Sequence, residues 1–264
     1  MKFECTDTYN WENAFRGLRH PLESYAKSDS QFGLADNDAW MDEIANEVAY
    51  SYIDNWKDER VDPNKEEIEN WLFENGSWLE CGKYAGTYAF IGNNDLDLAQ
   101  RMIKAGSPND KFLRQIFVSI DITAPLYWWK EMDTYKVATV ANSTSTMHKL
   151  ASTPITLDCF EMDDFDNNII EQLNDPYLIS IQGIIGFLET LRQKYLETKD
   201  IRYWKELIRW LPESWLQTRT WTANYATLRN IIHWRKGHKL TEWKQFLDWC
   251  KTLPYADELL FFEN

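Results

Sequence analysis

The sequence predicts a helix-rich α+β fold in which a sheet packs against helices. Within residues 114–123, Ile116, Val118, Ile120 and Ile122 point one way and Gln115, Phe117, Ser119, Asp121 and Thr123 the other, as in a strand with one buried face. Several other segments repeat apolar residues at helical spacing, most of them in the second half of the chain. A chain of 264 residues can bury one large core or two, and we expect a single domain over residues 1–264.

The N-terminal half is predicted to contain short strands and helices in alternation. Strands are expected at 2–5 and 84–91, and residues 22–36 are loop-like. The first helix begins after Thr8 or Asn10, either of which can cap it. Helical apolar spacing covers 11–18, 37–56, 63–74 and 96–105. Gly106 is expected to stop the last of these, since glycine is common just after a helix.

The clearest element is the strand at 114–123. Its inward-facing side chains are all β-branched and apolar, namely Ile116, Val118, Ile120 and Ile122. Ala124-Pro125 is expected to end the strand, because proline donates no ladder hydrogen bond.

The C-terminal half is predicted to be mainly helical. Helices are expected at 126–139, 169–197, 200–210, 222–237 and 241–252. Residues 142–146 are five small polar residues, which form either a turn cluster or a loop that grips a ligand.

Asn224 and Arg235 are the first candidate site residues. They are eleven residues apart, and a helix turning about 100° per residue returns them to nearly the same face, roughly 16 Å apart. Leu228 and Ile231 lie between them on that stripe. This arrangement suits a long ligand touched at two points. The alternative is an amphipathic helix whose asparagine is a cap and whose arginine is solvated.

Composition limits the class of partner. The formal net charge of −14 argues against an open nucleic-acid surface or attraction to anionic lipid, so direct nucleic-acid binding is not expected, whereas a free nucleotide needs only a few local cations. The four cysteines are scattered and predict neither a zinc site nor a disulfide framework. The acidic run at 161–168 is interpreted as a solvated connection, with a metal site as the alternative. No metal site is predicted.

The sequence also predicts where the protein is located and where its tryptophans lie. The sequence shows no signal peptide and no apolar run of membrane-spanning length, so we expect a cytoplasmic protein that does not enter membranes. The fourteen tryptophans are expected in the core or in subunit interfaces rather than in a base-stacking platform.

Two blocks of the sequence resemble the flavin-dependent thymidylate synthases. Residues 114–125 are similar to that family's strand ending in Ala-Pro. Downstream, the family's C-terminal pattern is matched with the same spacings by Leu211-Pro212, Trp221-Thr222, Asn224, Leu228 and Arg235. The blocks occur in the family's order and cover roughly the second half of the chain. Against this pattern, residues 33–82 look like a helical insertion.

The resemblance implies a homotetramer with a mixed sheet, a helical layer and active sites between subunits. It implies binding of FAD and of a pyrimidine nucleotide such as dUMP. It further implies transfer of a one-carbon unit from methylenetetrahydrofolate to the pyrimidine C5, with flavin as the hydride carrier and NADPH as a possible co-substrate. In such an enzyme the flavin carries out the hydride-transfer chemistry, and the protein orients and polarises the substrate.

The resemblance also assigns residues. Gln115 stands where the family has a flavin-contacting histidine, Asn224 matches a flavin-contacting asparagine, and Arg235 matches the arginine that grips the pyrimidine, which we assign to catalysis. At the family's arginine-rich signature, Lys136 is the one cation that remains, and we assign it to the flavin. The remaining substrate-binding candidates are Asn142, Thr144, Thr146 and Arg209.

The loss of cations from the signature predicts weaker phosphate and flavin binding, since charge-assisted hydrogen bonds are worth roughly 1.5–3 kcal/mol each. Two other readings therefore stay open: a catalytically altered or inactive relative that binds a nucleotide or a protein partner, and an acidic protein that imitates nucleic-acid charge.

Overall fold

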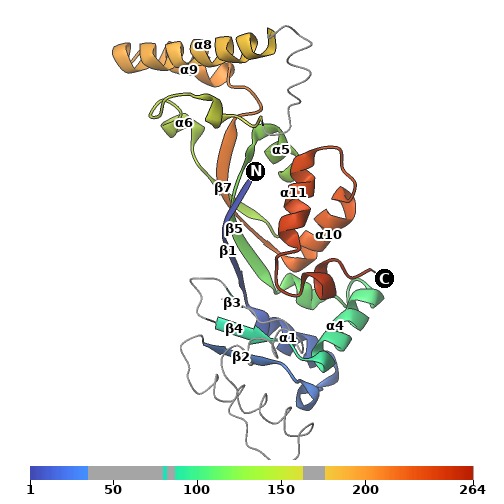
Figure 1. Ribbon diagram of the computed structural model, residues 1–264. Coiled ribbons are helices and arrows are strands. Elements are labelled where there is room, and N and C mark those ends of the chain that lie inside the picture. Colours follow the sequence, from blue (N-terminus) through green and yellow to red (C-terminus); the bar gives the residue numbers. More distant parts are fainter. Residues whose placement is uncertain (35–79, 82–86, 163–175, 264) are drawn as a thin grey trace, which may run out of the picture.

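The computed structural model describes residues 1–34, 80–81, 87–162 and 176–263. Its central sheet contains β1 (Lys2–Tyr9), β5 (Phe117–Pro125), β7 (Leu216–Asn224) and β6 (Val140–Ser143), in that order, and every neighbouring pair is antiparallel. Three helices lie on one side of this sheet, namely α5 (Leu126–Met132), α10 (Tyr225–Arg235) and α11 (Thr241–Cys250) (Figure 1). The predicted α+β class is confirmed.

Strand β5 has the burial pattern that its alternation predicts. Val118, Ile120 and Ile122 are buried against the helices, and Ile116 is buried just before the strand begins. The bounds differ from the prediction: a 3-10 turn, Lys111–Arg114, occupies the expected start, and the strand continues to Pro125. Proline is tolerated there because Pro125 is the strand's last residue.

Strand β7 was not predicted, and the helix expected at 222–237 is wrong at its start. Gln217, Trp221 and Ala223 face inward and are buried, while the threonines between them face outward. On that outer face the hydroxyls of Thr218, Thr220 and Thr222 bond across to β5, to Thr123, Asp121 and Ser119 respectively. These cross-strand pairs stabilise the sheet on the face opposite the helices.

Three further boundaries are corrected. The helix expected at 126–139 ends at Met132, because Tyr135 and Val137 turn back to contact α10. The segment 142–146 is split between strand β6 and a short helix, α6 (Thr146–Lys149). The first strand runs to Tyr9, with a bulge between Glu4 and Asp7, and α1 (Trp11–Arg19) begins after Asn10.

A second, small antiparallel sheet has the order β2 (Gln31–Leu34), β4 (Thr87–Phe90), β3 (Glu80–Cys81). The segment expected to be a loop at 22–36 therefore includes β2, preceded by 3-10 turns at His20–Leu22 and Tyr25–Lys27. Helix α4 (Asn93–Ala105) ends at Gly106, whose φ of 67° explains the glycine stop. The helices expected at 37–56 and 63–74, and most of the insertion at 33–82, lie outside the described residues.

The main core is rich in tryptophan, as predicted. Trp128 contacts Trp129 and Trp243, with ring centroids 5.0 Å apart in both cases, and Phe246 packs against the same cluster. All four rings are buried between the sheet and the helices. Trp210 and Trp234 are exposed in the single chain, and the expectation that such tryptophans lie in subunit interfaces stays a prediction.

Helices α8 (Pro176–Thr198) and α9 (Ile201–Arg209) pair with one another beyond the end of the central sheet (Figure 1). They close a separate hydrophobic cluster formed by Leu150, Ile155, Phe160, Leu188, Leu191 and Leu207. Both elements lie within their predicted ranges, apart from the last residue of α8. The single domain over 1–264 stays a prediction, and most of the acidic run at 161–168 lies outside the described residues.

Glu189 on α8 predicts a pH dependence for this helical pair. Hydrogen bonds from Arg192, then from the Ile155 backbone and Gln193, lower the pKa of Glu189 from 4.5 to about 2, against a raising effect of burial. A carboxyl with a lowered folded-state pKa contributes stability above pH 4.5, and that contribution is lost as the pH falls towards 2. We expect Glu189→Gln to flatten the acid-unfolding curve in this window. A circular dichroism titration of both proteins measures it, and parallel curves would contradict it.

None of the described helices combines the length and apolar composition that a membrane crossing requires. Cys5, Cys159 and Cys250 are free thiols, and burial raises the pKa of Cys250 well above its usual value. Within the described ranges, no group of three or more His, Cys, Asp or Glu side chains is placed to hold a metal ion.

Candidate functional site

Helix α10 positions the two residues on which the sequence argument depends. Asn224 is its N-cap, and the side-chain oxygen accepts a hydrogen bond of 2.9 Å from the Thr227 backbone N–H. Leu228 and Ile231 are fully buried, so the apolar stripe between the two candidates faces the core. Asn224 is itself only 3% exposed, and among the described residues its side-chain nitrogen has no acceptor. The capping alternative therefore holds for the oxygen and leaves the nitrogen available.

Gln115 lies beside Asn224 at the same end of the sheet. The Tyr225 N–H donates to the Ile116 carbonyl at 3.0 Å, which ties the start of α10 to the residue after Gln115. The Gln115 amide packs against α1: a Cβ added at Gly17 would meet its Oε1 at 2.7 Å. Glycine at position 17 thus allows the exposed Gln115 side chain to keep this position.

The turn at 133–139 runs along α10 and carries Lys136. Thr227 donates to the Val137 carbonyl at 3.0 Å near the beginning of the helix, and Arg235 donates to Tyr135 Oη at 2.8 Å at its end. Lys136, between these two anchors, is exposed. The structure therefore places Asn224 at the start of α10 and Arg235 at its end, with Gln115 and Lys136 next to residues that contact this helix.

Arg235 is held by a defined set of partners and is not a solvated arginine. Its Nη1 donates to Glu131 Oε2 at 2.7 Å, and its guanidinium lies 4.3 Å from the centroid of the Trp243 ring. The side chain is 16% exposed. Its Nη2 donates to no group in the described part of the chain, so one edge of the fork remains open to a ligand.

Glu131 is the centre of this cluster, which the sequence argument missed. The same oxygen accepts from Trp243 Nε1 at 2.9 Å and lies 3.6 Å from His238 Nε2. Arg235 and Trp243 lie 104 and 112 positions along the chain from Glu131. No local spacing could have identified such partners.

The other substrate-binding candidates are placed less closely. Asn142 is exposed on edge strand β6, opposite Thr220, and the Thr144 N–H donates to the Thr218 carbonyl at 2.9 Å. Thr146 begins α6. Arg209 is exposed at the end of α9, where it forms an ion pair with Glu206, and no described contact joins it to the residues along α10.

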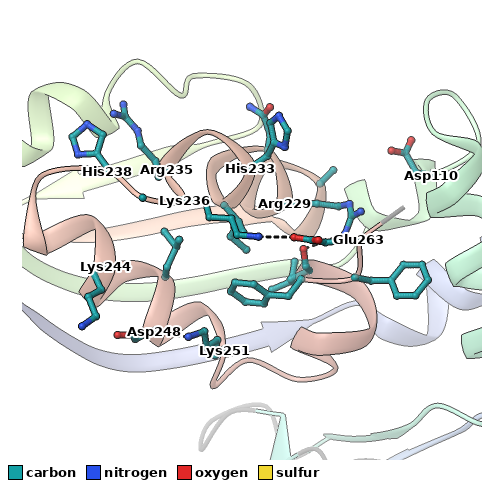
Figure 2. Close-up of a pocket in the computed structure, with 18 residues that line it drawn as sticks. Asp110, Arg229, His233, Arg235, Lys236, His238, Lys244, Asp248, Lys251 and Glu263 are labelled. Carbon is teal, nitrogen blue, oxygen red and sulfur yellow. Dashed lines mark hydrogen bonds and ion pairs between the residues drawn. The ribbon is translucent and has the colours of Figure 1, made fainter.

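A cavity of about 1190 Å³ lies between α10, α11 and the C-terminal segment (Figure 2). Arg235 and His238 occupy one end, and Arg229, Lys236, Lys244 and Lys251 also line it. The Lys236–Glu263 ion pair spans it, with Nζ and Oε1 2.5 Å apart (Figure 2). Lysine and arginine outnumber carboxylates here five to three, although the whole chain carries −14.

Comparison with known proteins supports the fold. No family model matches the chain, and no curated protein matches it significantly. Two crystal structures of the flavin-dependent thymidylate synthase ThyX from Helicobacter pylori, both with FAD and dUMP bound, are similar to it with a TM-score of 0.58. Their sequence identities are 14% and 15%, and each match covers 99% of this chain and 98% of the other. The chain therefore shares its fold, over nearly its whole length, with a thymidylate synthase of the flavin-dependent type.

Proposed function

We propose that this protein binds FAD and a pyrimidine nucleotide, dUMP or a relative, and acts as a flavin-dependent thymidylate synthase-like enzyme. The observation that carries the proposal is the grouping of Gln115, Lys136, Asn224 and Arg235 along α10, in a chain whose fold matches FAD- and dUMP-bound ThyX from end to end. These four positions were assigned from the resemblance of the sequence to the flavin-dependent thymidylate synthases, and Asn224 and Arg235 also from their eleven-residue spacing.

The residues present fit a flavin, in a site that has fewer cationic side chains than the family's. The Asn224 side-chain nitrogen donates to no acceptor in the described ranges, and Gln115 lies at the same end of the sheet. Lys136 supplies a positive charge for a phosphate. A flavin held there would supply the hydride. We expect weak binding, because one lysine replaces a cationic signature.

Arg235 is proposed to orient the nucleotide. Glu131 and Tyr135 fix two edges of its guanidinium, and the stacked Trp243 ring restricts the plane. A cation that is already ordered loses little freedom when it binds. The open Nη2 would then donate to a pyrimidine carbonyl or a phosphate oxygen. One-carbon transfer to C5 from methylenetetrahydrofolate, NADPH as a reductant and assembly as a homotetramer belong to the same proposal.

Fluorescence titration tests flavin binding. We expect the protein to quench FAD fluorescence to saturation, and Lys136→Gln to weaken binding about tenfold, since it removes one charge-assisted contact. Lys205→Gln, an exposed lysine on α9, is the matched control and should leave binding unchanged. Failure to saturate at millimolar FAD would exclude the flavin site. Equal effects of Lys136→Gln and Lys205→Gln would show that Lys136 does not contribute to the flavin site.

A second candidate is a nucleotide-binding relative that performs no chemistry. The observation that favours it is the engagement of Arg235 by Glu131, together with the single cation in the signature region. Release of tritium from [5-³H]dUMP separates the candidates, because only chemistry at C5 liberates that atom. Saturable dUMP binding without tritium release, with folate and NADPH present, would favour the second candidate.

A further inference from the structure

Among the described residues, Arg229 forms no ion pair with a carboxylate, although the protein is acidic. Its Nη1 donates to the backbone carbonyls of Leu259 and Leu260, at 3.1 Å each, which fixes the guanidinium against the last turn of the chain. Its Nε and Nη2 donate to no group in the part of the chain that the structure describes. Burial lowers the pKa of Arg229, and nearby Asp110 only partly offsets this. A cation that has lost hydration in this way favours an anionic ligand.

The surroundings of Arg229 combine positive charge with apolar surface. Lys244 of α11, Lys251 just after α11 and Lys236 just after α10 line the same cavity (Figure 2). Lys244 has no ion-pair partner among the described residues. The apolar part of the lining comes from Ile232, Leu247, Leu260 and Phe261. A cavity of about 1190 Å³ is large enough for an organic molecule, whereas a bare inorganic ion would leave the apolar lining unused.

Glu263 already places a carboxylate in this cavity. Its Oε1 lies 2.5 Å from Lys236 Nζ, and this hydrogen bond lowers the pKa of Glu263. Both side chains are largely exposed, at 77% and 72%. The pair is therefore held weakly and can be displaced by a ligand anion.

We propose that the cavity between α10, α11 and the C-terminal segment binds a small organic anion with an apolar or aromatic body, in competition with the Glu263 carboxylate. Arg229 and Lys236 would hold the charged group, and the apolar lining would hold the body. Arg235, which the proposed function assigns to the nucleotide, lines one end of this cavity, whereas Gln115, Asn224 and Lys136 do not line it. This anion site goes beyond the proposed function and does not depend on it.

The fluorescent probe 1-anilinonaphthalene-8-sulfonate has this chemistry, a single anionic group on aromatic rings. We expect saturable binding to the full-length protein that Arg229→Gln weakens about tenfold or more, since a charge-assisted contact is lost. Lys236→Gln should weaken binding about threefold, in keeping with an exposed charge, and keeps the site testable if Arg229→Gln does not fold. Glu263→Gln should tighten binding, because it removes the internal competitor and frees Lys236.

Control and competition complete the test. Lys205→Gln on α9 changes the net charge by the same amount and should leave probe affinity unchanged. Displacement of the probe by pyrophosphate would assign a phosphoryl ligand, and displacement by octanoate a carboxylate. The proposal is overturned if neither competitor displaces the probe, or if Lys236→Gln and Glu263→Gln match the Lys205→Gln control. FAD quenching should be unchanged in Lys236→Gln, so failure here is distinguishable from failure of the flavin site.

Discussion

Arg235→Ala is expected to weaken dUMP binding by roughly 1.5–3 kcal/mol, or about ten- to a hundredfold or more. The physical reason is the loss of a preordered guanidinium whose Nη2 edge is open to a ligand. Arg235→Lys should recover only part of this affinity, because an ammonium cannot reproduce the planar fork. Calorimetric titration of dUMP into each variant measures the effect.

Arg235 also has a structural role, and the test must separate the two. Removal of its side chain leaves Glu131, which is 34% exposed, without its ion-pair partner, so Arg235→Ala should lower the melting temperature as well. The double variant Arg235→Ala with Glu131→Gln removes the unpaired carboxylate and should restore most of the thermal stability. Nucleotide affinity should remain low in the double variant. Recovery of dUMP affinity together with stability would remove Arg235 from the binding site.

Asp95→Ala is expected to destabilise the protein by about 3–5 kcal/mol, the range typical of a broken buried ion pair. Arg19 Nε lies 2.6 Å from Asp95 Oδ1, and the two side chains are 6% and 0% exposed. Ser28 and Ser30 donate to the other carboxylate oxygen, at 2.6 and 2.5 Å. The substitution therefore leaves a buried guanidinium and two hydroxyls without their acceptor.

Asp97→Ala on the same helix is the matched control for Asp95→Ala. Asp97 pairs with Arg101 on the surface, and both side chains are more than 60% exposed. Its removal should change the free energy of unfolding by less than about 1 kcal/mol. Urea denaturation of both variants gives the comparison. Similar unfolding midpoints would show that the Arg19–Asp95 pair does not anchor α1 to α4.

Elements with a distinctive pattern over a few neighbouring residues were predicted from the sequence. The alternation of Ile116, Val118, Ile120 and Ile122 identified the buried face of β5, and Gly106 marked the end of α4. The start of α10 was placed too early. Asn224 fits the helical spacing of Leu228, Ile231 and Arg235, but it is the N-cap and so precedes the helix. Strand β7 could have been found from its alternating threonines.

The geometry of the candidate site was only partly accessible to the sequence. The resemblance assigned Gln115, Asn224 and Lys136 to one flavin site, and that assignment stays a prediction; in the structure their chain neighbours Ile116 and Val137 contact the start of α10. The Glu131 cluster depends on tertiary contacts between residues more than a hundred positions apart, and no periodicity reports those. For the same reason, the sequence predicted a helix through 133–139, whereas contacts with α10 hold these residues in a turn.

The absorbance spectrum of the purified protein with FAD, recorded with and without dUMP, tests the central claim most directly. If α10 and the turn at 133–139 form a joint flavin and nucleotide site, dUMP should shift the flavin absorption bands, and the shift should saturate. Arg235→Ala should require at least about tenfold more dUMP for the same change. Flavin bands that stay unchanged at saturating dUMP, or a protein that retains no FAD at millimolar concentration, would contradict the account.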